Sequence, residues 1–185
     1  MGVMIATGTD VVSFLKVQHD QAKRLLEAVA SSRGLERSQA FLTLRRALAV
    51  HETAEEEIVH PAARRELPGG EVVVRARLDE EHGVKKSLAE LEKLGLDTDE
   101  FTTKFGVLRM KVIAHMVAEE RDEFDRLVLA VDAQRLARMR RAAELAEAVA
   151  PTRPHAGIES AMANLLVGPF AAMLDRSRDA LSGKH

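Results

Sequence analysis

Cysteine, tryptophan and tyrosine are all missing from this sequence of 185 residues. Without cysteine the chain forms no disulfide, iron–sulfur cluster or thiolate site, so any metal must be held by nitrogen and oxygen ligands. Aromatic residues make up only 3% of the chain, whereas hydrophobic residues make up 46%. Alanine, leucine, valine, glutamate and arginine dominate, and this composition favours helices over a sheet protein.

A strong charge of either sign is also lacking, because the formal net charge is −2. The chain therefore shows no basic surface for nucleic acid and no polybasic membrane anchor. No hydrophobic run reaches transmembrane length, and the apolar stretch at residues 1–6 is too short and uncharged for a signal peptide. We expect a soluble, cytoplasmic protein with neither a nucleic-acid nor a membrane partner.

Apolar residues recur at helical spacing and predict four long helices in the first 130 residues. The first starts after Thr9 or Asp10, and the four cover about residues 10–31, 38–67, 71–94 and 98–130. Short connections between them predict an all-α fold, an antiparallel up-down four-helix bundle. We expect this bundle over residues 1–130 and a C-terminal helical extension over residues 131–185.

Two segments carry a histidine followed four residues later by a glutamate, namely His51 with Glu55 and His115 with Glu119. On a helix, residues four apart lie on one face about a turn apart, so each pair can present an imidazole nitrogen and a carboxylate to one metal ion. The spacing alone is weak evidence. His155 and Glu159 show it too, in a stretch rich in proline and glycine where no helix is expected.

The positions of four histidines strengthen this interpretation. His19, His51, His82 and His115 are 32, 31 and 33 residues apart, one on each predicted helix. Each lies roughly 13 to 18 residues from its turns, or about 20–27 Å along a helix, so an antiparallel bundle brings all four to one level. Four histidines and two glutamates meeting in an otherwise apolar core predict a metal site.

The pattern of one histidine, a His-x-x-x-Glu pair, one histidine and a second such pair resembles the hemerythrin-like HHE cation-binding family. The resemblance covers about residues 10–130, and the sequences at 51–61, 81–82 and 115–120 are similar to the helices of that family. It implies two iron ions, joined by an oxo or hydroxo bridge, with Glu55 and Glu119 as bridging carboxylates. The ligands so implied are His19, His51, Glu55, His82, His115 and Glu119.

The chain departs from hemerythrin proper at the third helix, where that protein has two histidine ligands four residues apart. Here the residues four before and four after His82 are Leu78 and Lys86, so the site is short of one imidazole. Water, Glu52, Glu81 or His60 can fill the gap. Glu52 follows His51 directly, as a glutamate does in an iron-sensing branch of the family. His60, nine residues after His51, is expected near the opposite helix face, in solvent or behind the ligands.

Two classes of function follow from the resemblance. The first is a di-iron protein that binds or reacts with dioxygen or peroxide, with catalase-like peroxide disproportionation as the enzymatic form. The second is a non-enzymatic sensor or store for oxygen, nitric oxide or iron. A closed structural metal site is the weakest reading, because structural sites fill their coordination shell.

The extension is similar to one found in actinobacterial relatives. It predicts a fifth helix over about residues 132–149 and a sixth over about 159–181, interrupted near Gly168. The apolar face of the sixth helix must be buried, either against the bundle or in a homodimer or partner contact. The second helix carries one further expectation: Pro61 should bend or interrupt it just after His60.

Overall fold

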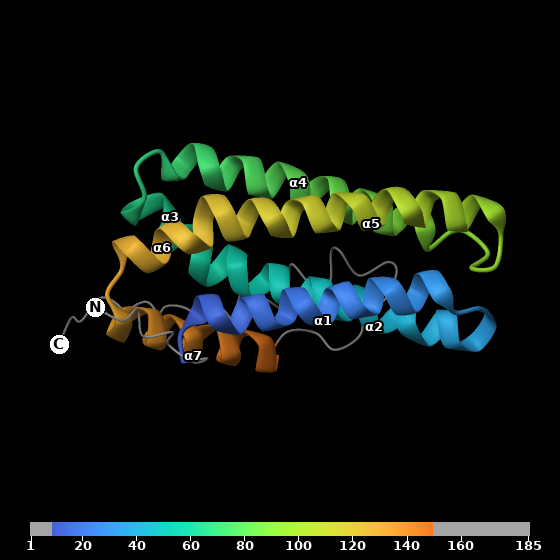
Figure 1. Ribbon diagram of the computed structural model, residues 1–185, viewed down its shortest axis with the longest axis horizontal. Coiled ribbons are helices and arrows are strands. Elements are labelled where there is room, and N and C mark those ends of the chain that lie inside the picture. The colour runs from blue at the N-terminus through green and yellow to red at the C-terminus, as the bar shows by residue number, and fades with distance from the viewer. Residues whose placement is uncertain (1–8, 150–185) are drawn as a thin grey trace, which may run out of the picture.

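The structure, a computed structural model, describes residues 9–149. Within this range the chain forms helices and turns and no strand, so the expected all-α bundle with added C-terminal helix is confirmed (Figure 1). The elements are α1 (Val11–Ser31), α2 (Gly34–Ala54), η1 (Glu55–Val59), α3 (His60–Glu66), α4 (Gly70–Leu91), α5 (Asp99–Glu119), η2 (Glu120–Phe124), α6 (Asp125–Ala130) and α7 (Ala133–Val149).

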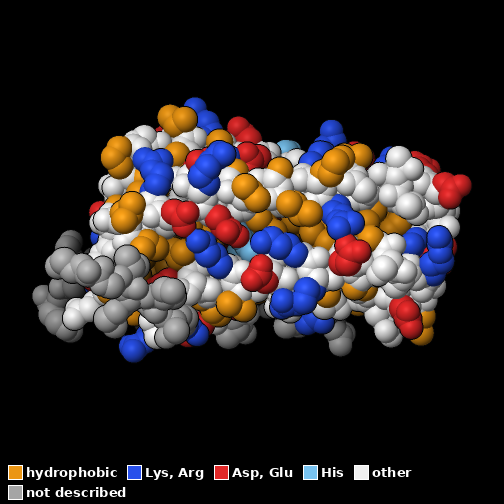
Figure 2. Space-filling view, viewed as in Figure 1, with side chains coloured by type: hydrophobic (Ala, Val, Ile, Leu, Met, Phe, Trp, Pro, Cys, Tyr) orange, Lys and Arg blue, Asp and Glu red, His pale blue; other side chains and the backbone are white. Residues whose placement is uncertain are grey.

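Four long rods build the bundle, because α2, η1 and α3 run on without a break, as do α5, η2 and α6. In Figure 1, α1 lies beside α2, α4 lies beside α5, and α7 lies along the beginning of α1. No helix in the range 9–149 is both long enough and apolar enough to cross a membrane. On the face shown in Figure 2, acidic and basic side chains are interspersed with apolar ones rather than gathered by sign.

The helix ends follow local chemistry. Asp10 caps α1, since its Oδ1 accepts a hydrogen bond from the Ser13 backbone N–H at 2.9 Å, and the Thr98 hydroxyl oxygen accepts one from the Phe101 N–H at 3.2 Å at the start of α5. The turn between α3 and α4 depends on two glycines. Gly69 has a φ of 72°, and a Cβ on Gly70 would lie 2.1 Å from the Ala63 carbonyl oxygen.

The second and fourth rods each contain a π-helical segment, and these two segments start at corresponding places. η1 begins at Glu55, the glutamate of the first His-x-x-x-Glu pair, and η2 begins directly after Glu119, the glutamate of the second. The second helix thus changes from α- to π-helical over Glu55–Val59, ahead of Pro61, and continues past His60, where a bend or interruption was expected. Proline alone does not explain this, because the fourth rod widens in the same way without one. Single π turns inside α-helices frequently mark functional sites.

Two apolar clusters fill the interior, one toward each end of the bundle. The first cluster includes Val11, Val12 and Leu15 of α1 together with Leu136 and Met139 of α7. Residues 133–149 of the extension thus share a hydrophobic core with the bundle. The boundary at residue 130 stays a prediction, and the predicted sixth helix with its homodimer contact lies outside the described residues.

Candidate metal centre

A layer of buried polar side chains separates the two apolar clusters. The layer consists of six side chains from all four rods, each with at most 6% of its surface exposed. They form two groups, and within each group the ligand atoms lie within 4.8 Å of one another. The first group is His19, His51, Glu55 and Glu119, and the second is Glu55, Glu81, His115 and Glu119. Glu55 and Glu119 belong to both groups, so the two groups overlap in two carboxylates.

The Nε2 atoms of the histidines point into this layer. His19 Nε2 lies 3.0 Å from His51 Nε2, and His51 Nε2 lies 3.3 Å from Glu55 Oε1. Glu119 stands between the two groups, with its Oε2 3.3 Å from His19 Nε2 and its Oε1 3.0 Å from His115 Nε2. One carboxylate thus reaches histidines on two different helices with its two oxygens.

Each of these three imidazoles uses its other nitrogen for an outward contact. The distances from Nδ1 are 2.8 Å to Glu120 Oε1 for His19, 2.8 Å to Gln18 Oε1 for His51, and 2.9 Å to Glu80 Oε2 for His115. An acceptor at Nδ1 keeps a proton there, so Nε2 is the nitrogen that can bind a metal. Histidines that bind metals show this arrangement almost without exception. Without a metal, one of the Nε2 atoms of His19 and His51 donates to the other, and Glu119 and Glu80 raise the pKa of His115 to about 9 against the effect of burial. These Nε2 protons must leave when a metal binds.

The inner atoms of the layer are left without hydrogen-bond partners. Within the described residues, five of these atoms make no hydrogen bond: both carboxylate oxygens of Glu55, both of Glu119, and Nε2 of His115. Burying a carboxylate that lacks hydrogen bonds is strongly unfavourable, and two of them side by side add mutual repulsion. The nearby His19 and His115 offset this cost for Glu119 but not for Glu55. Cations held between the carboxylates would remove both costs, so the side chains fit a metal centre with nitrogen and oxygen ligands.

The pKa values reflect this crowding of like charges. Burial and the adjacent charge of Glu119 raise the pKa of Glu55 well above its usual range. Burial acts in the same direction on Glu119, but His115 and His19 outweigh it and hold the pKa of Glu119 well below its usual range. Burial and the neighbouring His19 lower the pKa of His51 to about 3, so this imidazole is neutral and its Nε2 can donate a lone pair.

His82 is where the structure departs from the sequence-based ligand set. Its side chain is exposed on α4, and the adjacent Glu81, with 1% of its surface exposed, reaches the second group instead. Neighbouring residues on a helix point about 100° apart, so an inward Glu81 turns His82 outward. Glu81 was one of the alternatives for the missing ligand, and it also takes the place predicted for His82. The buried residues Val74, Arg77, Glu81 and Val84 mark the true inner face of α4.

His60 is buried and lies directly behind Glu81. Its Nε2 is 2.9 Å from Glu81 Oε1, and its Nδ1 is 2.8 Å from Glu123 Oε1. Burial alone would lower the pKa of His60, but these two carboxylates raise it to about 9, so His60 donates to both as an imidazolium.

Glu123 was not predicted from the sequence, although it lies four residues after Glu119. The expected place of His60 behind the ligands agrees with the structure, whereas a place in solvent does not.

Glu52, the remaining candidate for the extra ligand, belongs to neither group. It is buried beside the layer, and burial raises the pKa of Glu52 to about 7 in spite of Lys85, whose Nζ is 3.3 Å from Glu52 Oε2. The same ammonium lies 2.7 Å from Glu56 Oε1 and 3.5 Å from Glu81 Oε2. Lys85 thus lies among three carboxylates on the outer side of the second group and offsets part of their charge.

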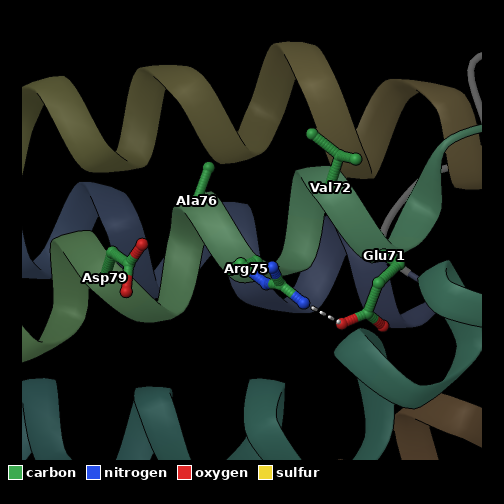
Figure 3. A pocket seen from close by; sticks show the side chains of 5 residues that line it. All are labelled: Glu71, Val72, Arg75, Ala76 and Asp79. Carbon is green, nitrogen blue, oxygen red and sulfur yellow. Dashed lines mark ion pairs between the residues drawn. The ribbon is translucent and has the colours of Figure 1, made fainter.

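Two hollows in the described surface bear on the extent of the centre. One, of about 270 Å³, is lined by His51, Gln18, Arg46 and Glu147 among others, and so adjoins the layer. The other, of about 280 Å³, lies on the outer face of α4 between Glu71 and Asp79 and shares no residue with the layer (Figure 3). Arg75 and Glu71 of this hollow pair with each other at 3.6 Å.

Comparison with known proteins agrees with this geometry. A family model described as the hemerythrin HHE cation binding domain matches residues 10–127. The fold is similar to the crystal structure of a hemerythrin HHE cation binding domain-containing protein from Mycobacterium kansasii, with a TM-score of 0.67 and 18% sequence identity. The similarity covers 92% of this chain and 99% of the other. No curated protein matches the chain.

Proposed function

The chain belongs to the hemerythrin HHE cation-binding domain family, and we propose that its buried layer of histidines and glutamates holds two iron ions. The observation that carries this proposal is the pair of four-residue groups that share Glu55 and Glu119. Two carboxylates common to both groups, each with unpaired buried oxygens, suit a pair of adjacent divalent cations better than a single ion. Imidazole and carboxylate together are typical ligands of non-haem iron.

The two positions would differ in character. The first is offered two imidazoles and two carboxylates, from His19, His51, Glu55 and Glu119, whereas the second is offered one imidazole, from His115, and three carboxylates. A set of four ligand groups at each ion leaves room for exchangeable ligands on iron, unlike a closed structural site. The hollow at His51 supports access by a molecule as small as hydrogen peroxide.

The function that this arrangement supports best is reaction with dioxygen or hydrogen peroxide, in its enzymatic form the conversion of two molecules of peroxide into two of water and one of dioxygen. Bound iron would supply the redox chemistry by cycling between ferrous and ferric states. The protein would supply neutral imidazoles, fixed by their outward hydrogen bonds, and a dry apolar surrounding. His60 and Lys85 would hold Glu81 and limit the net negative charge of the layer.

Anaerobic loading with ferrous iron, followed by metal analysis and a peroxide turnover assay, tests the proposal. We expect close to two irons per chain and peroxide turnover that is absent from the metal-free protein. A chain that retains no iron after gel filtration would contradict the proposed centre. A chain that holds iron but turns over no peroxide would favour the alternative, a non-enzymatic sensor or store for oxygen, nitric oxide or iron.

A further inference from the structure

A chain of hydrogen bonds runs from α7 to the first group of the layer. Gln18 of α1 stands between His51 and Glu147, with its Oε1 2.8 Å from His51 Nδ1 and its Nε2 donating to Glu147 Oε1. Glu147 lies on α7, beyond the part of the chain that the family model matches. Both Gln18 and Glu147 line the hollow at His51.

The chemistry of these three groups fixes the direction of every bond between them. An ionised carboxylate only accepts hydrogen bonds, so the side of the Gln18 amide that faces Glu147 must be its NH₂ group. The amide oxygen then faces His51 and can only accept, so the proton of the neutral imidazole must lie on Nδ1. The lone pair of His51 consequently lies on Nε2, which points at His19 Nε2 and Glu55 Oε1.

The opposite orientation of the Gln18 amide would move the His51 proton to the other ring nitrogen. With its NH₂ group toward His51, the amide would donate to Nδ1 and place the imidazole proton on Nε2. A protonated Nε2 aimed into the layer cannot bind a metal ion. Gln18 alone does not choose between the two orientations, because its amide has an acceptor and a donor of nearly equal size. A carboxylate on the far side makes the choice.

The geometry points to Glu147 as a positioning residue that, through Gln18, sets the tautomer of His51 and so prepares it to bind metal. The extension would then contribute to the centre although none of its described residues reaches the layer. This inference rests on the proposed function as far as metal binding is concerned. The tautomer of His51 in the metal-free protein is independent of that function.

The full-length chain with Glu147→Gln is the test, and Glu144→Gln is the matched control. Both changes remove one carboxylate charge from α7, but Glu144 pairs with Arg140 at 2.8 Å and does not line the hollow at His51. An amide at position 147 keeps the volume but can both donate and accept, so it no longer fixes the Gln18 amide. Long-range ¹H–¹⁵N spectra of the metal-free proteins report the His51 tautomer, with the signals assigned by their loss in His51→Gln.

We expect His51 to carry its proton on Nδ1 in the unchanged chain and in Glu144→Gln, and to populate both tautomers in Glu147→Gln. Titration with Co(II) against a chelator should show affinity weakened about 10-fold in Glu147→Gln, the lower end of the range for groups behind a metal ligand. The double variant Gln18→Glu with Glu147→Gln places the carboxylate next to His51 and the amide outside, and should recover most of that affinity.

Identical tautomers and Co(II) affinities in Glu147→Gln and Glu144→Gln would overturn the inference, as would a double variant that binds no better than Glu147→Gln alone. Failure of the proposed function looks different. If the unchanged chain binds no Co(II), the metal centre is wrong, while the spectra still show whether Glu147 sets the tautomer of His51.

Discussion

Single residues decide which atoms face the centre, and Glu81 and His82 show this most clearly. They are adjacent in sequence, yet Glu81 is buried in the layer and His82 is exposed. Histidine is the more familiar metal ligand, but a side chain on the outer face of α4 cannot reach the layer. The position of a residue on the helix, rather than its type, therefore decides which side chain of α4 reaches the layer.

Neutral substitutions at these two positions should have very different effects. Glu81→Gln should lower iron content from about two per chain toward one and weaken binding at the second position more than 10-fold, because an amide lacks the carboxylate charge. His82→Gln should leave iron content unchanged. Metal analysis after identical loading and gel filtration measures both. The reverse pattern, with iron lost only in His82→Gln, would restore the ligand set predicted from the sequence.

The Glu55 carboxylate should destabilise the metal-free protein, although iron binding requires it. In the metal-free protein its buried carboxylate lies against Glu119 without a hydrogen bond, which raises its pKa and costs free energy of folding. Glu55→Gln should therefore raise the free energy of unfolding of the metal-free protein by about 1–2 kcal/mol while abolishing iron binding.

Urea unfolding of the metal-free proteins measures the effect of Glu55→Gln, with Glu56→Gln as the control. Glu56 is half-exposed and pairs with Lys85, so its loss should change stability by less than about 0.5 kcal/mol. A metal-free Glu55→Gln protein less stable than the unchanged one would mean that the carboxylate is stabilised within the layer even without a cation.

Among the elements, the two π-helical segments and the tight turn before α4 set the relative positions of the ligands. A π turn contains more residues than an α turn, so everything after η1 and η2 is rotated relative to a continuous α-helix. This rotation accounts for His60, which an unbroken helix would place on the face opposite His51. With the π turn, His60 meets Glu123, which lies in the second such segment.

Two glycines of α4 should respond oppositely to alanine. At Gly70 a Cβ would collide with the Ala63 carbonyl, so Gly70→Ala should cost about 1–3 kcal/mol and displace the start of the helix that carries Glu81. At Gly83 a Cβ meets nothing within 4 Å, so Gly83→Ala should stabilise the protein by about 0.5–1 kcal/mol. The midpoints of urea unfolding measure the stability of both variants. Equal effects of the two changes would show that the turn before α4 tolerates a side chain.

On the scale of the whole molecule, the layer is held between two apolar clusters, and α7 closes one of them. Met139 of α7 is 2% exposed and packs in the same cluster as Leu15 of α1, four residues before His19. The helix that continues past the family match is thus a structural part of the bundle rather than an appendage.

Truncating a buried side chain on α7 should destabilise the entire bundle. Met139→Ala should lower the free energy of unfolding by about 2–5 kcal/mol in one cooperative transition. Leu129→Ala, at a side chain 88% exposed, should change it by less than about 0.5 kcal/mol. Circular dichroism during urea unfolding records both. Two separate transitions, with only the smaller one shifted by Met139→Ala, would support a domain boundary at residue 130.

The sequence by itself determined much of this protein. Helical periodicity and the cap at Thr9 or Asp10 depend on neighbours within a few residues, so the helices and the bundle could be predicted. The His-x-x-x-Glu pairs could be predicted for the same reason, because a spacing of four defines one helix face whatever surrounds it. The resemblance to the family came from these same local features.

Only the tertiary structure decided which face of α4 looks inward, and with it the choice of Glu81 over His82. A helix with charged residues on several sides offers more than one possible inner face, and packing against three other rods selects one. The same holds for His60, Glu123 and the link from Glu147 through Gln18 to His51, since each joins residues at least 33 positions apart or depends on a π turn. Local spacing carries no information about such contacts, because they exist only once the rods are packed.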